Sequence, residues 1–154
     1  MKVIFLDVDG VLNSIKDYDE HYKDSENKPI LYDDVEERPL LLLKELVDKT
    51  GAKIVVSSSW RKIEKLYHKL GNALYEYGMR IYDVTPYRYN KDRSDEIYEW
   101  LYDKNIESFV ILDDDNFKFE ESGLGKYLIK TTYDDGLRTE HIEKAIKILN
   151  GECE

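Results

Sequence analysis

Sulfur chemistry and membrane insertion have little basis in this sequence. Its 154 residues include one cysteine, Cys153, so no intramolecular disulfide can form. No apolar run approaches the roughly 20 residues that a membrane-spanning helix needs, and the N-terminus reaches Asp7 without the basic and apolar pattern of a signal peptide. We therefore predict a cytoplasmic protein with no membrane partner and no redox role for its cysteine.

Internal repeats and low-complexity linkers are also absent, which leaves no obvious place to divide the chain. Hydrophobic residues make up 42% of the composition and aromatic residues 12%, enough to exclude a disordered chain and to support a globular core. A chain of this length suits one domain of ordinary size. We predict a single domain over residues 1–154.

Positive charge is scarce, and the net charge of −10 argues against a polyanionic partner for the molecule as a whole. The segment from Lys53 to Arg93 is the exception, with nine basic and four acidic residues; its net charge of +5 leaves −15 for the rest. Six of the 13 tyrosines lie in the same segment. Rings among cations suit the bases and phosphates of nucleotides, whereas a solvated helix surface explains the same pattern without any ligand.

Apolar runs alternate with segments of helical periodicity along the chain. Five runs read as strands: residues 2–7, 52–58, 79–84, the apolar part of "SFVILDDD" from Ser108, and 126–132. Four segments read as helices: 35–51, 60–77, 94–104 and 137–149. The polar stretch 13–34 has little to bury and reads as a loop or flap. The alternation predicts an α/β, three-layer Rossmann-like domain with a mainly parallel five-stranded sheet and helices on both faces.

Polar side chains collect where the predicted strands end. Asp7 and Asp9 follow the first strand, Ser57 and Ser58 end the second, and Asp113–Asp115 follow the fourth. In parallel sheets, ligands bind outside these carboxyl ends. A single aspartate there, such as Asp115, reads equally well as a turn or capping residue. Two acidic clusters on one edge would repel each other unless a cation bound between them, and carboxylate oxygens suit Mg²⁺.

Such an edge has the groups needed to bind and transfer a phosphoryl group. A metal ion, the Ser57 hydroxyl and a cation from Lys91 or Arg93 would neutralise the phosphoryl oxygens. One aspartate could then attack phosphorus while the second, two residues later, exchanges protons. These residue types therefore predict covalent catalysis by a carboxylate.

The segment "DVDGVLN", from Asp7 to Asn13, resembles the first motif of the haloacid dehalogenase (HAD) superfamily. The serine after the second strand, the basic residue before a helix and "LDDD" after the fourth strand resemble its other three motifs, in the same order. The resemblance implies a Mg²⁺-dependent phosphatase in which Asp7 is the nucleophile and forms an aspartyl-phosphate. Asp9 would protonate the leaving oxygen, activate water and offer its backbone carbonyl to the metal.

The resemblance also assigns roles to the remaining motif residues. Gly10 belongs to the predicted substrate-binding group because it lets the chain turn tightly after the two acids. Ser57 would hold a phosphoryl oxygen, with Ser58 as the alternative. Arg93 is preferred to Lys91 as the basic residue of the third motif. The carboxylates of Asp113 and Asp114 would complete the metal site.

The chain has no segment long enough for the cap domain of larger superfamily members, which implies an open site. It most resembles small uncapped domains found in nucleotide and RNA-repair contexts. The expected substrate is a phosphorylated small molecule or nucleotide, including the terminal phosphate of a nucleic acid, with a sugar phosphate as an alternative. Predicted substrate contacts lie in the basic segment at Trp60, Arg61, Tyr87 and Arg88.

A phosphoacceptor receiver domain is the main alternative from another class. Receivers combine a similar sheet with an acidic Mg²⁺ pocket, a hydroxyl residue and a lysine, but in a different order along the chain. Here the serine precedes the basic residue, and the acids return after the fourth strand. This order favours the phosphatase interpretation.

Overall fold

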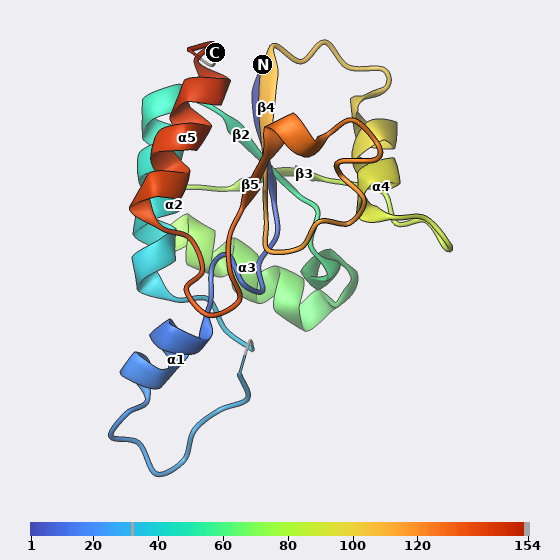
Figure 1. Ribbon diagram of the computed structural model, residues 1–154. Helices are drawn as coiled ribbons and strands as arrows, with labels where there is room; N and C mark the ends of the chain where they lie inside the picture. The colour runs from blue at the N-terminus through green and yellow to red at the C-terminus, as the bar shows by residue number, and fades with distance from the viewer. Residues whose placement is uncertain (32, 153–154) are drawn as a thin grey trace.

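The computed structural model describes residues 1–31 and 33–152, so the prediction for Cys153 lies outside the described residues. Five strands form one sheet in the order β3-β2-β1-β4-β5, and every neighbouring pair is parallel (Figure 1). This confirms the predicted parallel α/β sheet. The strands are β1 (Lys2–Leu6), β2 (Lys53–Val56), β3 (Ile81–Val84), β4 (Ser108–Asp113) and β5 (Leu128–Lys130).

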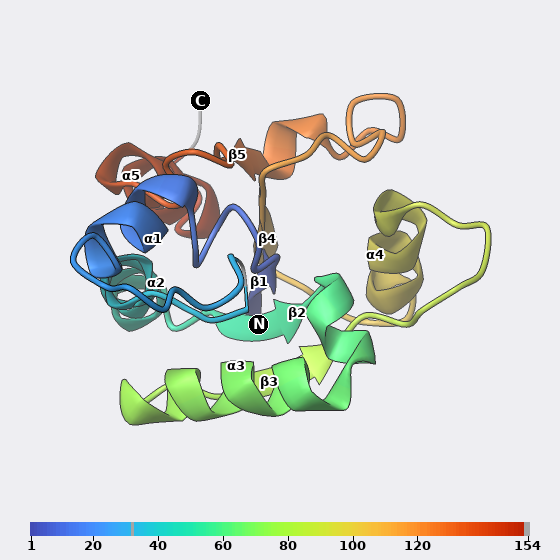
Figure 2. The ribbon, with the colours of Figure 1, turned by 90° about the horizontal axis from the view of Figure 1, so that it is seen from below.

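Helices cover both faces of the sheet and create three layers. The helices are α1 (Ile15–His21), α2 (Glu37–Thr50), α3 (Glu64–Glu76), α4 (Arg93–Leu101) and α5 (Thr139–Leu149). Leucines of α2 and α3 and Ala145 of α5 pack into the core on one face. Ile97 and Trp100 of α4 pack with Phe119 on the other. Figure 2 shows α4 across the sheet from α2 and α5.

The centre of the sheet is apolar because β1 and β4 are buried on both faces. Val3 to Leu6 are fully buried, as are Val110 to Leu112 of β4, which is the pattern of a strand covered by helices on each side. The chain passes from β1 outward to β2 and β3, and then returns across the sheet to β4. The strand order therefore reverses between β1 and β4, and ligands of open parallel sheets bind outside the carboxyl ends of the strands at such a position.

The polar stretch 13–34 contains a short helix where the sequence analysis expected a loop or flap. Ser14 caps α1 by accepting a hydrogen bond from the backbone N–H of Asp17 at 3.1 Å. Arg38 of α2 holds α1 in place by donating a hydrogen bond to Asp17 at 2.8 Å. The same guanidinium donates to the carbonyl of Leu137 at 2.6 Å. Because α1 buries none of its residues, it has no apolar stripe to reveal it in the sequence.

The predicted helix 60–77 is divided into two elements. A 3₁₀ helix, η1 (Ser59–Lys62), precedes α3, and Ile63 between them has extended dihedral angles. A second 3₁₀ helix, η2 (Gly125–Tyr127), replaces the first part of the predicted last strand. Within the described residues there is no cap domain, and no helix has the length and apolarity needed to span a bilayer.

Candidate active site

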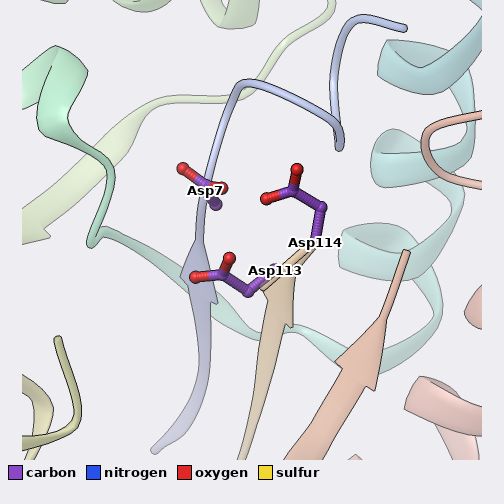
Figure 3. Close-up of side chains that lie close together, drawn as sticks. All are labelled: Asp7, Asp113 and Asp114. Atoms are coloured by element: carbon purple, nitrogen blue, oxygen red, sulfur yellow. The ribbon is translucent and has the colours of Figure 1, made fainter. Parts of the chain in front are cut away.

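Three carboxylates meet at the point where the strand order reverses (Figure 3). Asp7 follows β1, Asp113 ends β4 and Asp114 comes next along the chain. Leu6 of β1 pairs with Leu112 of β4, and the Asp7 backbone N–H donates to the Leu112 carbonyl at 3.0 Å, so the acids that follow lie side by side. One carboxylate oxygen from each aspartate lies within 4.8 Å of the others.

Arg93 is the cation that faces these carboxylates. The backbone N–H of Asp92 donates to Asp95 at 3.0 Å, closing the N-terminus of α4 with Arg93 at its first position. The Arg93 guanidinium lies 2.7 Å from Asp113 Oδ2 and 3.2 Å from Asp7 Oδ1. Burial acts to lower the pKa of Arg93, but the charges of Asp7 and Asp113 raise it overall.

The carboxylates nonetheless carry more negative charge than Arg93 offsets. Burial, followed by the negative charge of Asp7, raises the pKa of Asp113 to about 8. The same causes, in the same order, raise the pKa of Asp114 to about 6. Close carboxylates with raised pKa values favour either a bound proton or a bound cation. Three oxygen donors at this spacing fit a hard divalent cation such as Mg²⁺.

The side chain of Asp9 stands apart from this cluster, although the predicted metal set included Asp9. Its Oδ1 accepts two hydrogen bonds, from Trp60 Nε1 at 3.0 Å and from Asn13 Nδ2 at 3.1 Å. Burial raises the pKa of Asp9 in spite of these two donors, which lower it. Oδ1 is therefore held by protein donors, and the Asp9 side chain is not one of the three carboxylates that lie together.

Gly10 shapes the site by its lack of a side chain. It has a φ of +80°, and a Cβ at this position would lie 2.6 Å from Cγ of Asp114. Its carbonyl accepts a hydrogen bond from Thr131 Oγ1 at 2.6 Å. The absence of a Cβ at Gly10 therefore lets Asp114 approach the turn, and its predicted place in the substrate-binding group stays a prediction.

The two candidate serines have different environments. Ser57 follows β2 and is fully buried, and its backbone N–H donates to the Leu6 carbonyl at 3.0 Å. Within the described part of the chain its hydroxyl has no hydrogen-bond partner. The Ser58 hydroxyl, by contrast, caps η1 by accepting from the Trp60 backbone N–H at 3.1 Å. Of the two serines, Ser57 is therefore the one whose hydroxyl is not engaged by another described residue.

Lys91 and Arg93, the two candidates for the basic motif, also differ in their surroundings. Lys91 is exposed in the loop before α4, whereas Arg93 contacts two of the three carboxylates. The Phe117 ring covers the other side of Arg93, with its centroid 4.2 Å from the guanidinium carbon. The described geometry thus favours Arg93, as the sequence analysis did, and leaves Lys91 at the rim of the site.

Arg61 requires a correction, because the structure gives it a structural role in place of a substrate contact. Its side chain is 4% exposed and forms an ion pair with Glu96 at 2.9 Å. The remaining N–H groups of the guanidinium donate to backbone carbonyls, so all five of its N–H groups have acceptors. These carbonyls belong to Ser57, Ser58, Thr85 and Pro86.

Trp60 is also corrected, since it is 1% exposed and its indole N–H points at Asp9 instead of outward toward a substrate. Arg88 and Tyr87 stay on the surface. Arg88 pairs with Glu99 at 3.0 Å, and the Tyr87 ring lies 3.7 Å from the Lys62 ammonium. These surface residues remain candidates for substrate contact.

Three residues of the site escaped the sequence analysis. Asn13 is the first residue of the predicted flap, 13–34, and the last residue of "DVDGVLN". Its place in that motif is the one sequence signal that points to the site. Glu96 and Thr131 act through partners 35 and 121 positions away in the chain. Nothing in their local sequence indicates those partners.

The sheet is parallel, three acids lie at the carboxyl ends of its central strands, and an arginine faces them. With no cap domain among the described residues, these features are typical of a small HAD-type domain. The chain belongs to the family described as the HAD domain in Swiss Army Knife RNA repair proteins, whose model matches residues 3–142. This confirms the HAD resemblance and separates the chain from receiver domains. No curated protein and no solved structure matches it.

Proposed function

We propose that this protein is a Mg²⁺-dependent phosphomonoesterase that acts through an aspartyl-phosphate on Asp7. The observation that supports this most strongly is the surroundings of Asp7. Its carboxylate lies between two further acids and Arg93, and the partnerless buried hydroxyl of Ser57 follows the neighbouring strand. A nucleophile, a cation that contacts it and a hydroxyl without a partner among the described residues therefore lie at the same edge of the sheet.

Asp7, Asp113 and Asp114 would hold the metal ion, with the Asp9 backbone carbonyl as a further oxygen ligand. Their fit rests on the three mutually close oxygens and on the raised pKa values of Asp113 and Asp114, which result from burial and then from the negative charge of Asp7. When bound, Mg²⁺ would supply charge neutralisation for the phosphoryl oxygens. Arg93 and Ser57 would hold two of those oxygens by hydrogen bonds.

The reaction then has two steps. In the first, an Asp7 oxygen attacks phosphorus, the bond to the leaving oxygen breaks, and Asp9 donates a proton to that oxygen. In the second, Asp9 accepts a proton from water, the water oxygen attacks phosphorus, and the bond from phosphorus to Asp7 breaks. Inorganic phosphate leaves, and both carboxyl groups return to their starting states.

The substrate class we favour is a nucleotide or a nucleic-acid terminal phosphate. Three things support it: the family description in terms of RNA repair, the open site, and a basic rim beside Arg93. This basic rim consists of Lys62, Tyr87, Arg88 and Lys91. Exposed rings among cations suit bases and phosphates. Sugar phosphates are the competing class, because they too would reach an open site.

The test compares phosphate release from a mononucleotide, a short oligonucleotide with a terminal phosphate, and a sugar phosphate, with and without Mg²⁺. We expect chelation to abolish turnover and Mg²⁺ to restore it. We expect Asp7→Asn to lose at least about 10³-fold in kcat, a barrier increase of about 4 kcal/mol, with an unchanged thermal melt. Near-normal turnover in Asp7→Asn, or full activity in excess chelator, would reject the proposal. A phosphorylated Asp7 that persists well beyond seconds would indicate a phosphoacceptor module instead.

A further inference from the structure

Both hydrogen bonds to the Asp9 carboxyl group that the described residues make end on the same oxygen, Oδ1. Oδ1 accepts N–H hydrogen bonds from Trp60 at 3.0 Å and Asn13 at 3.1 Å. An oxygen that already accepts two N–H donors is a poor place for a proton, because a hydroxyl there would face those donors. The exchangeable proton of a neutral Asp9 therefore belongs on Oδ2.

Both donors are themselves held firmly. The Trp60 ring is packed in the apolar core with 1% of the residue exposed, and the indole N–H is the only polar group on its side chain. The Asn13 amide oxygen accepts from the Gly10 backbone N–H at 3.0 Å, and its amide nitrogen also donates to the Asp34 carbonyl at 3.0 Å. Neither side chain can turn without losing a buried hydrogen bond, which is costly.

We propose that Trp60 and Asn13 are positioning residues, which hold Oδ1 of Asp9 so that Oδ2 exchanges protons with the leaving group and with water. This inference rests on the proposed phosphatase function. It assigns Trp60 a role behind the acid/base residue, where its N–H sets the orientation of the carboxyl group. Proton transfer requires such orientation, since donor and acceptor must come within hydrogen-bond reach.

The leaving group provides a readout that distinguishes positioning from general damage. An alkyl phosphate expels a strongly basic alkoxide and needs a proton from Asp9, whereas 2,4-dinitrophenyl phosphate expels a weakly basic phenolate and does not. The value of kcat/KM reports transition-state stabilisation for the first step. Loss of positioning should therefore reduce kcat/KM for the alkyl ester alone, whereas distortion of Asp7 or the metal site would reduce it for both.

The experiment compares Trp60→Phe with a matched control, Trp100→Phe. Trp100 is also buried, with 3% exposed, and its indole N–H also donates to a carboxylate, that of Asp83 at 2.8 Å. We expect Trp60→Phe to lower kcat/KM for the alkyl ester at least about tenfold and for the dinitrophenyl ester less than about threefold. Trp100→Phe should change neither ester selectively. Equal losses on both esters, or no loss on either, would overturn the inference.

Replacing Trp60 with 3-benzothienylalanine keeps the bicyclic ring and removes only the N–H, so it serves if the phenylalanine variant is unstable. The contact itself can be read by NMR, because the two tryptophans give two indole N–H resonances. Asp9→Ala should shift the Trp60 resonance and Asp83→Ala the Trp100 resonance; an unmoved Trp60 signal would overturn the inference.

If the wild-type protein hydrolyses neither ester, the phosphatase function fails and the inference with it. If wild type hydrolyses both and Trp60→Phe is silent, only the inference fails.

Discussion

At the scale of single residues, the site depends on close approaches that allow almost no change of volume. Asp114 packs against the place where Gly10 lacks a Cβ, and the five N–H groups of Arg61 are all engaged. Gly10 acts by leaving room for Asp114, and Arg61 acts on Glu96 and four backbone carbonyls. A substitution at Gly10 or Arg61 should therefore change the property that depends on the neighbouring residue: Mg²⁺ affinity for Asp114, and the free energy of unfolding for Glu96.

Gly10→Ala should weaken metal binding as well as stability. Both the positive φ and the contact with Asp114 oppose a Cβ, and the backbone conformation alone costs about 1–2 kcal/mol for a non-glycine residue. The matched control is Gly51→Ala, because Gly51 has a φ of +71° and nothing within 4 Å of its Cβ position. Calorimetric titration with Mg²⁺ and thermal melts should show a loss of stability in both variants and a loss of Mg²⁺ affinity in Gly10→Ala only. Equal Mg²⁺ affinity in the two variants would contradict the packing role of Gly10.

Arg61→Ala should destabilise the fold strongly, because it leaves the buried carboxylate of Glu96 without its cation. Breaking a buried ion pair by removing one partner costs about 3–5 kcal/mol. Arg88→Ala is the control, since Arg88 is 55% exposed in its pair with Glu99 and such pairs contribute at most about 1 kcal/mol. Urea unfolding measures both. A stable Arg61→Ala variant with weakened substrate binding would restore the original substrate-contact hypothesis.

At the scale of secondary-structure elements, parallel pairing of β1 with β4 determines the electrostatics. The apolar parts of the two strands end at the same level, where Leu6 pairs with Leu112, so the acids that come next are forced together. Helix α4 begins at the same edge and delivers Arg93, which offsets part of the charge. The negative charge that Arg93 does not offset makes the three carboxylates sensitive to pH and to divalent cations.

The metal-free protein should lose stability as the pH rises from about 4 to about 8. The pKa values of Asp114 and Asp113 are raised to about 6 and about 8, so between about pH 4 and pH 8 the folded state binds more protons than the unfolded state. The contribution of these two groups is therefore fully present near pH 4 and declines as they ionise. Because Mg²⁺ competes with those protons, the rise in Tm that it causes should grow from pH 5 to pH 8. Thermal melts with and without Mg²⁺ measure this, and a Mg²⁺ effect independent of pH would contradict it.

At the scale of the whole molecule, the distribution of charge matters more than its sum. The chain carries −10 overall, yet the basic rim and Arg93 belong to the segment 53–93, whose net charge is +5. A long polyanion would be repelled by most of the surface, whereas a short terminal segment could contact the rim. This arrangement favours substrates whose phosphates beyond the terminal one are few.

Turnover of the oligonucleotide should therefore fall with salt more steeply than turnover of the mononucleotide. Each additional phosphate contact releases counterions, and the slope of log affinity against log salt is roughly proportional to the number of such contacts. Lys62→Ala should reduce the slope, while Lys126→Ala should not. Lys126 is the matched control because it also lies near a tyrosine ring, at 5.2 Å from Tyr127, but in η2, away from the carboxyl ends of the strands. Best turnover of the sugar phosphate with no effect of Lys62→Ala would identify the basic segment as solvated surface only.

The sequence by itself determined the parallel α/β sheet and the edge that bears the acids. Buried parallel strands require continuous apolar runs, and the acids of β1 and β4 follow those runs directly, so both signals are local. The order of the motifs can also be read directly from the sequence, and this order distinguishes the HAD pattern from that of a receiver domain.

Only the tertiary structure decided which neighbouring residue takes which role. Trp60 and Arg61 occur in a basic, aromatic segment, and their composition suggested substrate contacts. Their partners, Asp9 and Glu96, lie 51 and 35 positions away, and folding buries Trp60, Arg61 and Glu96 and part of Asp9. Burial removes water as a competing partner, so each polar group must find a protein partner. That partner is fixed by packing between distant segments, which no local pattern of residues records.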